Sequence, residues 1–298
     1  MNLGYACINT ALSANKITTN RTMRRKTFDA QGIDYVSDLA LLNVKDLKTI
    51  VQWNIEMKIN LFRLSSQIFP WSDEYNVEDL KDYEEIRVLM LEIGEIATKA
   101  GQRLIMHPGP YNCLASPTQT VVDKTIRELN SHSKQFNMFG FKPSNYNKIN
   151  IHVGGAYGDK ALTLTRFCKN FSLLNDDTKK RLVIENDDSP NEYSVKDLFD
   201  GIYQVIGIPI TFDYFHHKFN TGGLTEEQAL KMAAVTWPEG VTQCCHYSES
   251  RRKEKLDESI RAQAHSDIIY EKINTYGTNP DIVIEAKMKE QAIFKRPI

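Results

Sequence analysis

Short apolar runs recur along this chain and alternate with longer segments whose apolar residues follow helical spacing. Each run has the length of a buried strand, and each intervening segment is long enough for a helix that crosses back over a sheet. The runs are Leu3–Ala6, Asn60–Leu64, Arg103–Met106, Lys148–Val153, Arg181–Ile184, Ile208–Phe212, Val241–Cys245 and Asp281–Ile284. Eight strands that alternate with helices predict an α/β protein with the (β/α)8 TIM barrel fold, forming a single domain over residues 1–298.

A doubly wound open sheet is the competing architecture for this alternation. Such a sheet usually has a glycine-rich turn after its first strand, and Leu3-Gly4-Tyr5 is not a turn of that kind. Two helix starts are also marked, because Ser194 with Asp197 and Thr225 with Gln228 have the spacing of capping boxes. The barrel is therefore the expected fold.

The residues that end these runs carry the chemistry. In a barrel the carboxyl ends of all strands meet on one face, where active sites lie. The residues at these ends are Tyr5, Arg63, His107, His152, Glu185, Asp213 with His216, His246, and Glu285. Six of the eight strands therefore end in a residue that can bind a metal. One shared metal site explains all six strand ends together, whereas a purely structural role would need a separate reason for each residue.

The number of candidate ligands predicts more than one metal ion. Four histidines and three carboxylates exceed the three or four protein ligands of a single catalytic metal. Two or three ions that share bridging carboxylates are the economical interpretation, with Glu185 as the expected bridge. His265 lies in the segment Ala262–His265, which has a helical pattern, and its own context predicts an ordinary surface histidine.

Composition limits the cellular compartments and the binding partners that we expect for this protein. A net charge of −1 excludes a bulk polyanion binder, so contact with nucleic acid requires local positive charge. Arg21–Lys26 and Arg251–Lys255 are the two basic segments, and each alone reads as a solvated loop. Five scattered cysteines favour free thiols, and neither a signal peptide nor a membrane-spanning run is evident. We expect an intracellular protein in a reducing compartment, without a membrane partner.

Taken in order, several segments resemble the UV damage endonuclease family. They are Gly4–Asn9, Thr19–Arg24, Phe62–Ser66, His107–Tyr111, His152–Gly158, Glu185–Asp187, Asp213–His217 and Glu285–Gln291. The resemblance implies a TIM-barrel hydrolase that acts on phosphodiester bonds of damaged double-stranded DNA, as a monomer with access to DNA. It implies incision 5′ to cyclobutane dimers and 6-4 photoproducts, with abasic sites as a further candidate lesion, leaving a 3′-hydroxyl and a 5′-phosphate.

The resemblance also implies the site residues. The implied metal ligands are His107, His152, Glu185, Asp213, His216, His246, His265 and Glu285. Among them, Glu185, Asp213, His246 and Glu285 are the expected catalytic residues. The implied cofactors are two or three divalent ions, with Mn²⁺ expected first and Mg²⁺, Zn²⁺ or Co²⁺ as alternatives.

Five further residues are implied to bind the DNA substrate. Tyr5 and Tyr111 match positions that reach into the duplex and stack on bases at the lesion. Asn9 matches a polar residue near the scissile phosphate, and Arg21 and Arg24 match phosphate contacts. For Tyr5 and Tyr111 this role requires exposed side chains.

Three departures from the family pattern bear on lesion range and on the third metal. Pro110 replaces a glutamine, and Gln67 stands where a bacterial relative has a histidine. Cys244 stands where bacterial relatives have a lysine, on the strand face that His246 occupies. Cys244 either contacts a metal or fills the barrel interior.

Two other functions fit parts of this pattern. A xylose-isomerase-like sugar isomerase or epimerase also gathers histidines and carboxylates around divalent metals in a barrel. A non-catalytic barrel that binds damaged DNA is the third hypothesis, which the complete ligand set disfavours. The number of ligands, an exposed Tyr5 and Tyr111, and the arginine-rich loop distinguish the endonuclease from a sugar enzyme.

Overall fold

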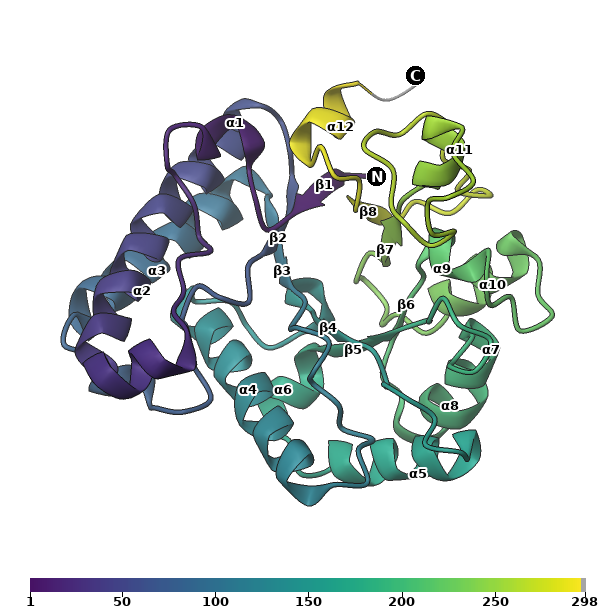
Figure 1. Cartoon of the computed structure of the whole chain (residues 1–298), viewed down its shortest axis with the longest axis horizontal. Helices are drawn as coiled ribbons and strands as arrows, with labels where there is room; N and C mark the ends of the chain where they lie inside the picture. Colours follow the sequence, from purple (N-terminus) through teal and green to yellow (C-terminus); the bar gives the residue numbers. More distant parts are fainter. Residues whose placement is uncertain (296–298) are drawn as a thin grey trace.

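The computed structural model describes residues 1–295, in which eight parallel strands alternate with helices around a barrel (Figure 1). The strands are β1 (Leu3–Ala6), β2 (Leu61–Leu64), β3 (Arg103–Met106), β4 (Ile149–Ile151), β5 (Leu182–Glu185), β6 (Ile210–Thr211), β7 (Cys244–Tyr247) and β8 (Asp281–Ile284). Each of the eight predicted runs overlaps a strand, and only β5 and β7 extend beyond the predicted ends, by one and two residues. The predicted TIM barrel is confirmed.

The sheet closes at a pair of candidate metal ligands. Its hydrogen-bonded order is β6-β5-β4-β3-β2-β1-β8-β7, so β6 and β7 are its edge strands. Asp213, just after β6, forms a parallel bridge with His246 of β7, and the His246 amide donates to the Phe212 carbonyl at 2.9 Å. Closure of the barrel thus brings these two ligands together.

Helices surround the barrel on its outside (Figure 1). The α-helices are α1 (Thr10–Ser13), α2 (Arg25–Glu56), α3 (Tyr83–Ala100), α4 (Gln119–Met138), α5 (Lys160–Phe171), α6 (Asp176–Arg181), α7 (Val195–Leu198), α8 (Gln204–Ile206), α9 (Tyr214–His217), α10 (Glu226–Ala234), α11 (Arg251–Lys255) and α12 (Glu290–Phe294). Short 3₁₀ segments η1 (Val77–Asp79) and η2 (Asn145–Asn147) and a π-helical segment η3 (Phe199–Tyr203) complete the elements. None of the helices within residues 1–295 has the length and apolar character that crossing a membrane requires.

Local sequence signals set several of these boundaries. The capping box predicted at Ser194 opens α7, and the one predicted at Thr225 opens α10, with both reciprocal hydrogen bonds in each. The helical pattern expected for Ala262–His265 is wrong, because this segment is a turn that leads into a bridge between His265 and Ser250. The hydrogen bonds of that bridge hold His265 in place.

The barrel interior is layered by the two-residue period of its strands. An apolar cluster contains one residue from each of several strands: Ala6, Leu61, Ile105, Val183, Cys244 and Val283. Two positions further along the same strand faces lie Arg63, His107, Glu185, His246 and Glu285. This apolar layer, the apolar floor of the barrel, lies directly beneath the polar layer that contains the candidate ligands.

Candidate metal centre

Glu185 lies at the centre of the polar layer. Its Oε2 is 3.0 Å from His246 Nδ1, 3.4 Å from His107 Nε2 and 3.8 Å from His152 Nε2. Two groups of possible ligand atoms, each within 4.8 Å of one another, contain it: His107 with His152, and Asp213 with His246. A carboxylate common to both groups occupies the position of a bridge between two metal ions.

Hydrogen bonds fix the orientation of three imidazoles. The Nδ1–H groups of His107 and His216 donate to the carbonyls of Pro108 and Asn186, each at 2.8 Å. His152 Nδ1 lies 2.7 Å from Asp187 Oδ1 and donates to that carboxylate. A donor at Nδ1 leaves Nε2 with a lone pair, which is the arrangement of metal-binding histidines held by a second layer of acceptors.

Asp213 serves the helix and the cluster with different oxygens. Its Oδ1 accepts from the amides of Phe215 at 2.7 Å and His216 at 2.8 Å, capping α9. This cap places His216 within 3.5 Å of Glu185, measured from Nδ1 to Oε1. Asp213 Oδ2 is buried and has no hydrogen-bond partner among residues 1–295. One oxygen is therefore left for a ligand.

The buried carboxylates respond differently to their surroundings. Burial raises the pKa of Glu185, but the opposing effects of His246, His152 and His107 together outweigh it, and the pKa lies well below its usual range. Burial also raises the pKa of Glu285, and Arg63 reverses this effect. For Asp213 burial dominates and raises the pKa to about 6. Neighbouring positive charge therefore lowers the pKa of Glu185 and Glu285, whereas burial dominates at Asp213.

The histidines supply that charge in the absence of a cation. Burial lowers the pKa of His246 to about 4. Burial also lowers the pKa of His152 and His216, but the carboxylates Glu185 and Asp213 outweigh it. The resulting pKa values are about 10 for His152 and about 9 for His216. Protonated imidazoles thus balance the carboxylates where a divalent cation would replace their protons.

The donor set fits divalent metal ions. His246 Nδ1 lies 3.0 Å from Glu185 Oε2 and 3.4 Å from Glu285 Oε1, yet within the described chain it makes no hydrogen bond. The unpartnered Asp213 Oδ2 belongs to the same group of atoms. Buried nitrogen and carboxylate oxygen atoms that converge in this way are a donor set that a divalent cation can bind.

Glu285 and His265 form the edge of the centre nearest to β8. Glu285 pairs with Arg63 Nη1 and lies 3.4 Å from His246. His265 Nδ1 lies 3.2 Å from the Glu285 carbonyl and 3.8 Å from its Oε2. The structure therefore brings all eight predicted ligands to one face of the barrel.

Four residues of the centre were not among the predicted site residues. Asp187 orients His152, and Arg63 pairs with Glu285. Lys148 Nζ lies 3.4 Å from His246 Nε2, and Asn150 Nδ2 donates to Glu185. Lys148 and Asn150 precede His152 by four and two positions, so the strand period could have placed them on its face.

The exposure expected for Tyr5 is wrong. Its ring is fully buried, and its hydroxyl donates to Asn54 Oδ1 of α2 at 2.7 Å. The physical reason is the pleat of β1: Ala6 belongs to the interior cluster, so its neighbour Tyr5 faces the helices, where it packs against Phe62. In this conformation Tyr5 does not reach a base.

Asn9 and Arg21 are engaged within the protein. Asn9 is buried, caps α1 by accepting from the Leu12 amide, and donates to the Tyr5 hydroxyl at 2.8 Å. The placement of Asn9 beside a phosphate is therefore not what this conformation presents. Arg21 Nη2 pairs with Asp46 at 2.6 Å, which ties the loop before α2 to that helix.

Tyr111 and Arg24 are exposed, as their expected contacts with DNA require. Tyr111 lies in the loop after β3, and Arg24 immediately precedes α2. Pro110, beside Tyr111, is also exposed. Gln67 accepts a hydrogen bond from Thr22 at 3.2 Å and so links the loop after β2 to the arginine-rich segment.

Cys244 lies in the apolar floor of the barrel, fully buried among Ala6, Ile105 and Val283. The groups of metal-ligand atoms found in residues 1–295 do not contain it. This position favours the expectation that Cys244 fills the barrel over the one that it contacts metal.

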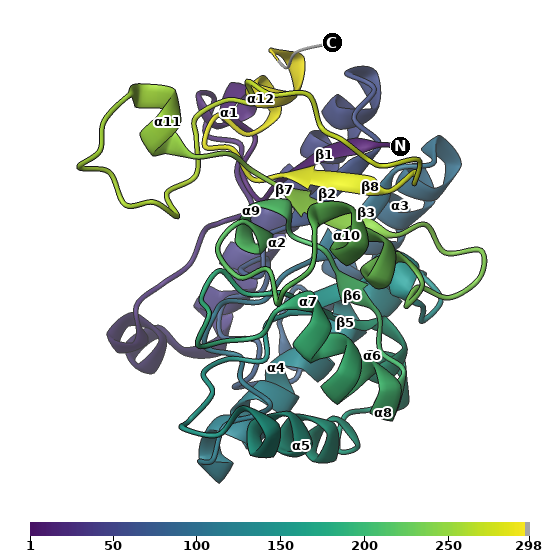
Figure 2. The same ribbon diagram turned by 90° about the vertical axis from the view of Figure 1, so that its right-hand side faces the viewer.

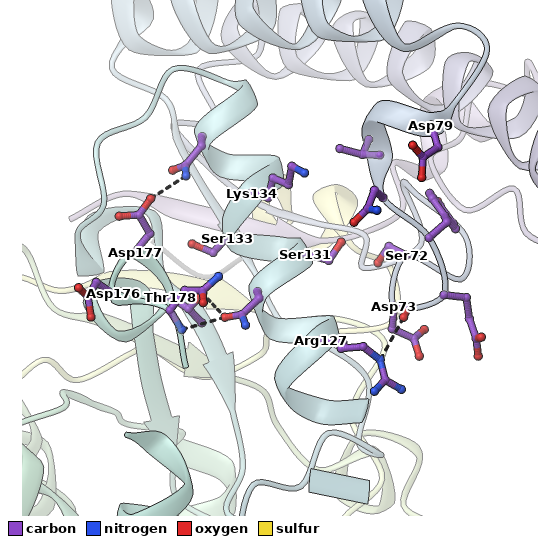
Figure 3. Close-up of a pocket in the computed structure, with 17 residues that line it drawn as sticks. Ser72, Asp73, Asp79, Arg127, Ser131, Ser133, Lys134, Asp176, Asp177 and Thr178 are labelled. Atoms are coloured by element: carbon purple, nitrogen blue, oxygen red, sulfur yellow. Dashed lines mark hydrogen bonds between the residues drawn. The ribbon is translucent and has the colours of Figure 1, made fainter. Parts of the chain in front are cut away.

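Two concavities differ in their relation to the centre. A depression of about 340 Å³ is lined by His107, His152 and His216, together with the loop that precedes Tyr111. A larger one of about 770 Å³ lies along the outside of α4, where Arg127 and Lys134 face the acidic residues of neighbouring segments (Figure 3). The smaller concavity opens onto the candidate ligands.

Known proteins resemble this chain over nearly its whole length. The sequence model of the UV-endonuclease UvdE family matches residues 1–296. The UV-damage endonuclease of Schizosaccharomyces pombe is 37% identical over 98% of this chain, which spans only 49% of that relative's length. The putative UV-damage endonuclease of Acanthamoeba polyphaga mimivirus is 33% identical over 98% of this chain and 89% of its own length.

Solved structures show the same relationship. The crystal structure of SacUVDE superposes with a TM-score of 0.84 at 29% identity, covering 98% of this chain and 95% of that one. D-psicose 3-epimerase from Clostridium cellulolyticum H10 gives a TM-score of 0.54 at 13% identity, over 80% and 78% of the two chains, which is a likeness of fold alone. On its sequence and its fold, this chain belongs to the UV-endonuclease UvdE family.

Proposed function

We propose that this chain is a metal-dependent DNA repair endonuclease that incises the backbone 5′ to cyclobutane dimers and 6-4 photoproducts. Incision leaves a 3′-hydroxyl and a 5′-phosphate, and abasic sites are a further substrate. The observation that carries the proposal is the convergence of histidines and carboxylates on Glu185, in a chain of the UvdE family. The chain acts as a monomer, and its barrel is one domain.

The eight ligands described above would hold two or three divalent ions, with Mn²⁺ as the first choice. Such ions would supply activation of a water molecule and stabilisation of the leaving oxygen of a phosphodiester. The chain's own part is positional: Glu185 joins the two ligand groups, and Asp213 fixes His216 through the cap of α9. Hydrogen bonds that Nδ1 donates to protein acceptors keep three imidazoles oriented before metal and substrate arrive.

We assign damage recognition to the exposed loop after β3, which carries Tyr111. Tyr111 stands free of the protein surface beside the depression over the ligands. A photoproduct weakens base pairing, which lowers the cost of extruding its nucleotides, and stacking on an aromatic ring recovers part of that cost. With Tyr5 buried, Tyr111 carries this role in the observed conformation. A sugar isomerase has no use for such a residue, and only a likeness of fold supports that alternative.

Replacement of the shared carboxylate tests the proposal. Glu185→Gln removes the charge that joins the two ligand groups, so incision of an end-labelled, UV-irradiated duplex with Mn²⁺ should fall by more than tenfold, or by more than about 1.4 kcal/mol in activation free energy. The matched control is Glu249→Gln, a buried carboxylate outside the cluster that binds Tyr247 and two backbone amides. It should retain incision. Equal activity in Glu185→Gln and wild type would contradict the proposed role.

A further inference from the structure

Two exposed apolar side chains stand apart from all others in residues 1–295. Leu256 is 93% exposed and Tyr111 is 90% exposed, whereas the next large apolar residue, Val235, is 66% exposed. Tyr111 belongs to the loop after β3, and Leu256 lies at the end of α11, in the long segment after β7. Both segments therefore leave the barrel at the face that carries the candidate ligands.

The backbone at Leu256 strengthens the distinction. Leu256 is the C-cap of α11 and has a left-handed conformation, with φ 50° and ψ 42°. This conformation suits glycine or asparagine and disfavours a branched apolar side chain. Both the backbone conformation and the exposure of an apolar side chain to water therefore disfavour leucine at this position.

Barrel topology places the strands that precede Tyr111 and Leu256 on opposite sides of the ring. In the ring order β6-β5-β4-β3-β2-β1-β8-β7, strands β3 and β7 are separated by four steps in either direction. Their ligands His107 and His246 meet between them, with ring centroids 5.9 Å apart. Figure 2 shows α11 and its loop standing out from the rest of the barrel. A substrate that covers the ligands passes between the two segments.

One exposed cation near Leu256 is placed to contact a phosphate. Residues 251–261 contain five basic and three acidic side chains; Arg251, Arg252, Lys255 and Arg261 pair with carboxylates, whereas Lys253, one turn before Leu256, is exposed. Cations that contact phosphates, beside an apolar residue that enters a groove, are a combination found in proteins that wedge into duplex DNA.

We propose that α11 forms a second contact with the duplex, in which Leu256 enters a groove from the side opposite Tyr111 and Lys253 contacts a phosphate. This inference rests on the proposed function, because it names a further part of the same substrate surface. Leu256 and Tyr111 then hold the damaged duplex between them over the ligands. The contact stabilises the bound duplex and takes no part in the chemical step.

Single-turnover incision by the metal-loaded protein tests this inference. Raising the concentration of Leu256→Gly over a duplex with one cyclobutane dimer gives the half-saturating concentration and the maximal rate separately. We expect the half-saturating concentration to rise about tenfold, because the variant loses the apolar surface that Leu256 would bury against the duplex. The maximal rate should stay within about twofold of the wild-type rate. The melting temperature should not fall, because glycine adopts the left-handed conformation readily.

Val235→Gly is the matched control, since Val235 is an exposed apolar C-cap of α10 outside the two segments. It should leave the half-saturating concentration unchanged. If Leu256→Gly saturates at the wild-type concentration, the inference is wrong while the proposed function stands. If the wild-type protein fails to cut the irradiated duplex, both are wrong.

Discussion

Lys148 illustrates how single residues outside the ligand set shape the centre. Its amine is fully buried, donates to Thr211 Oγ1 at 2.7 Å and Asn150 Oδ1 at 3.1 Å, and lies 3.4 Å from His246 Nε2. Lys148→Met removes these contacts but keeps most of the volume. We expect Mn²⁺ affinity to fall about tenfold, as for other groups that orient ligands, with an unchanged or higher melting temperature because a buried amine is lost. Calorimetric titration with Mn²⁺ and thermal unfolding measure both.

Cys244→Ala is the control from the same interior. Cys244 packs in the apolar floor, so its truncation should lower stability and leave metal affinity intact. A loss of Mn²⁺ affinity in Cys244→Ala, or its retention in Lys148→Met, would contradict these roles. The convergence of the candidate ligands was predictable because strand ends meet on one face. The burial of Tyr5 was not, since it depends on the pleat of β1 and on Asn54, far away in the sequence.

At the scale of elements, the packing of α3 against the end of α4 requires Gly94. A β-carbon there would lie 1.8 Å from the carbonyl oxygen of Phe139. Alanine favours a helix by about 1 kcal/mol over glycine, but overpacking typically costs about 1–3 kcal/mol. Because the obstacle is backbone, we expect Gly94→Ala to lower the free energy of unfolding in urea. Glu95→Ala, at an exposed position of the same helix, should change it by less than about 0.5 kcal/mol.

Equal or greater stability in Gly94→Ala would show that the two helices can separate without loss of stability.

The glycine also shows where sequence patterns stop being informative. Strand positions were predictable because each strand is a compact apolar run of its own. The close approach of α3 to Phe139 and the turn at Ala262–His265 arise from contacts between distant segments. Local spacing carries no record of such contacts.

At the scale of the whole molecule, residues of the candidate metal centre also close the barrel. Glu285 follows β8, Glu185 ends β5, and the bridge between Asp213 and His246 joins the two edge strands of the sheet. The eight-strand pattern predicted the barrel, but it could not show that closure passes through two candidate ligands. Since the carboxylates at this junction require positive charge, a metal ion at the centre should stabilise the fold as well as the site.

Removal of metal tests this link between site and fold. A ligand present at a hundred times its dissociation constant adds about 2.7 kcal/mol to stability, so chelation by EDTA should lower the melting temperature by roughly 5–10 °C. The physical reason is that the cation replaces the protons that balance the buried carboxylates. Asp213→Asn should abolish the difference between chelated and Mn²⁺-loaded protein, whereas Glu249→Gln should keep it. Identical melting temperatures of the wild-type protein with EDTA and with saturating Mn²⁺ would show that the barrel closes without the metal's help.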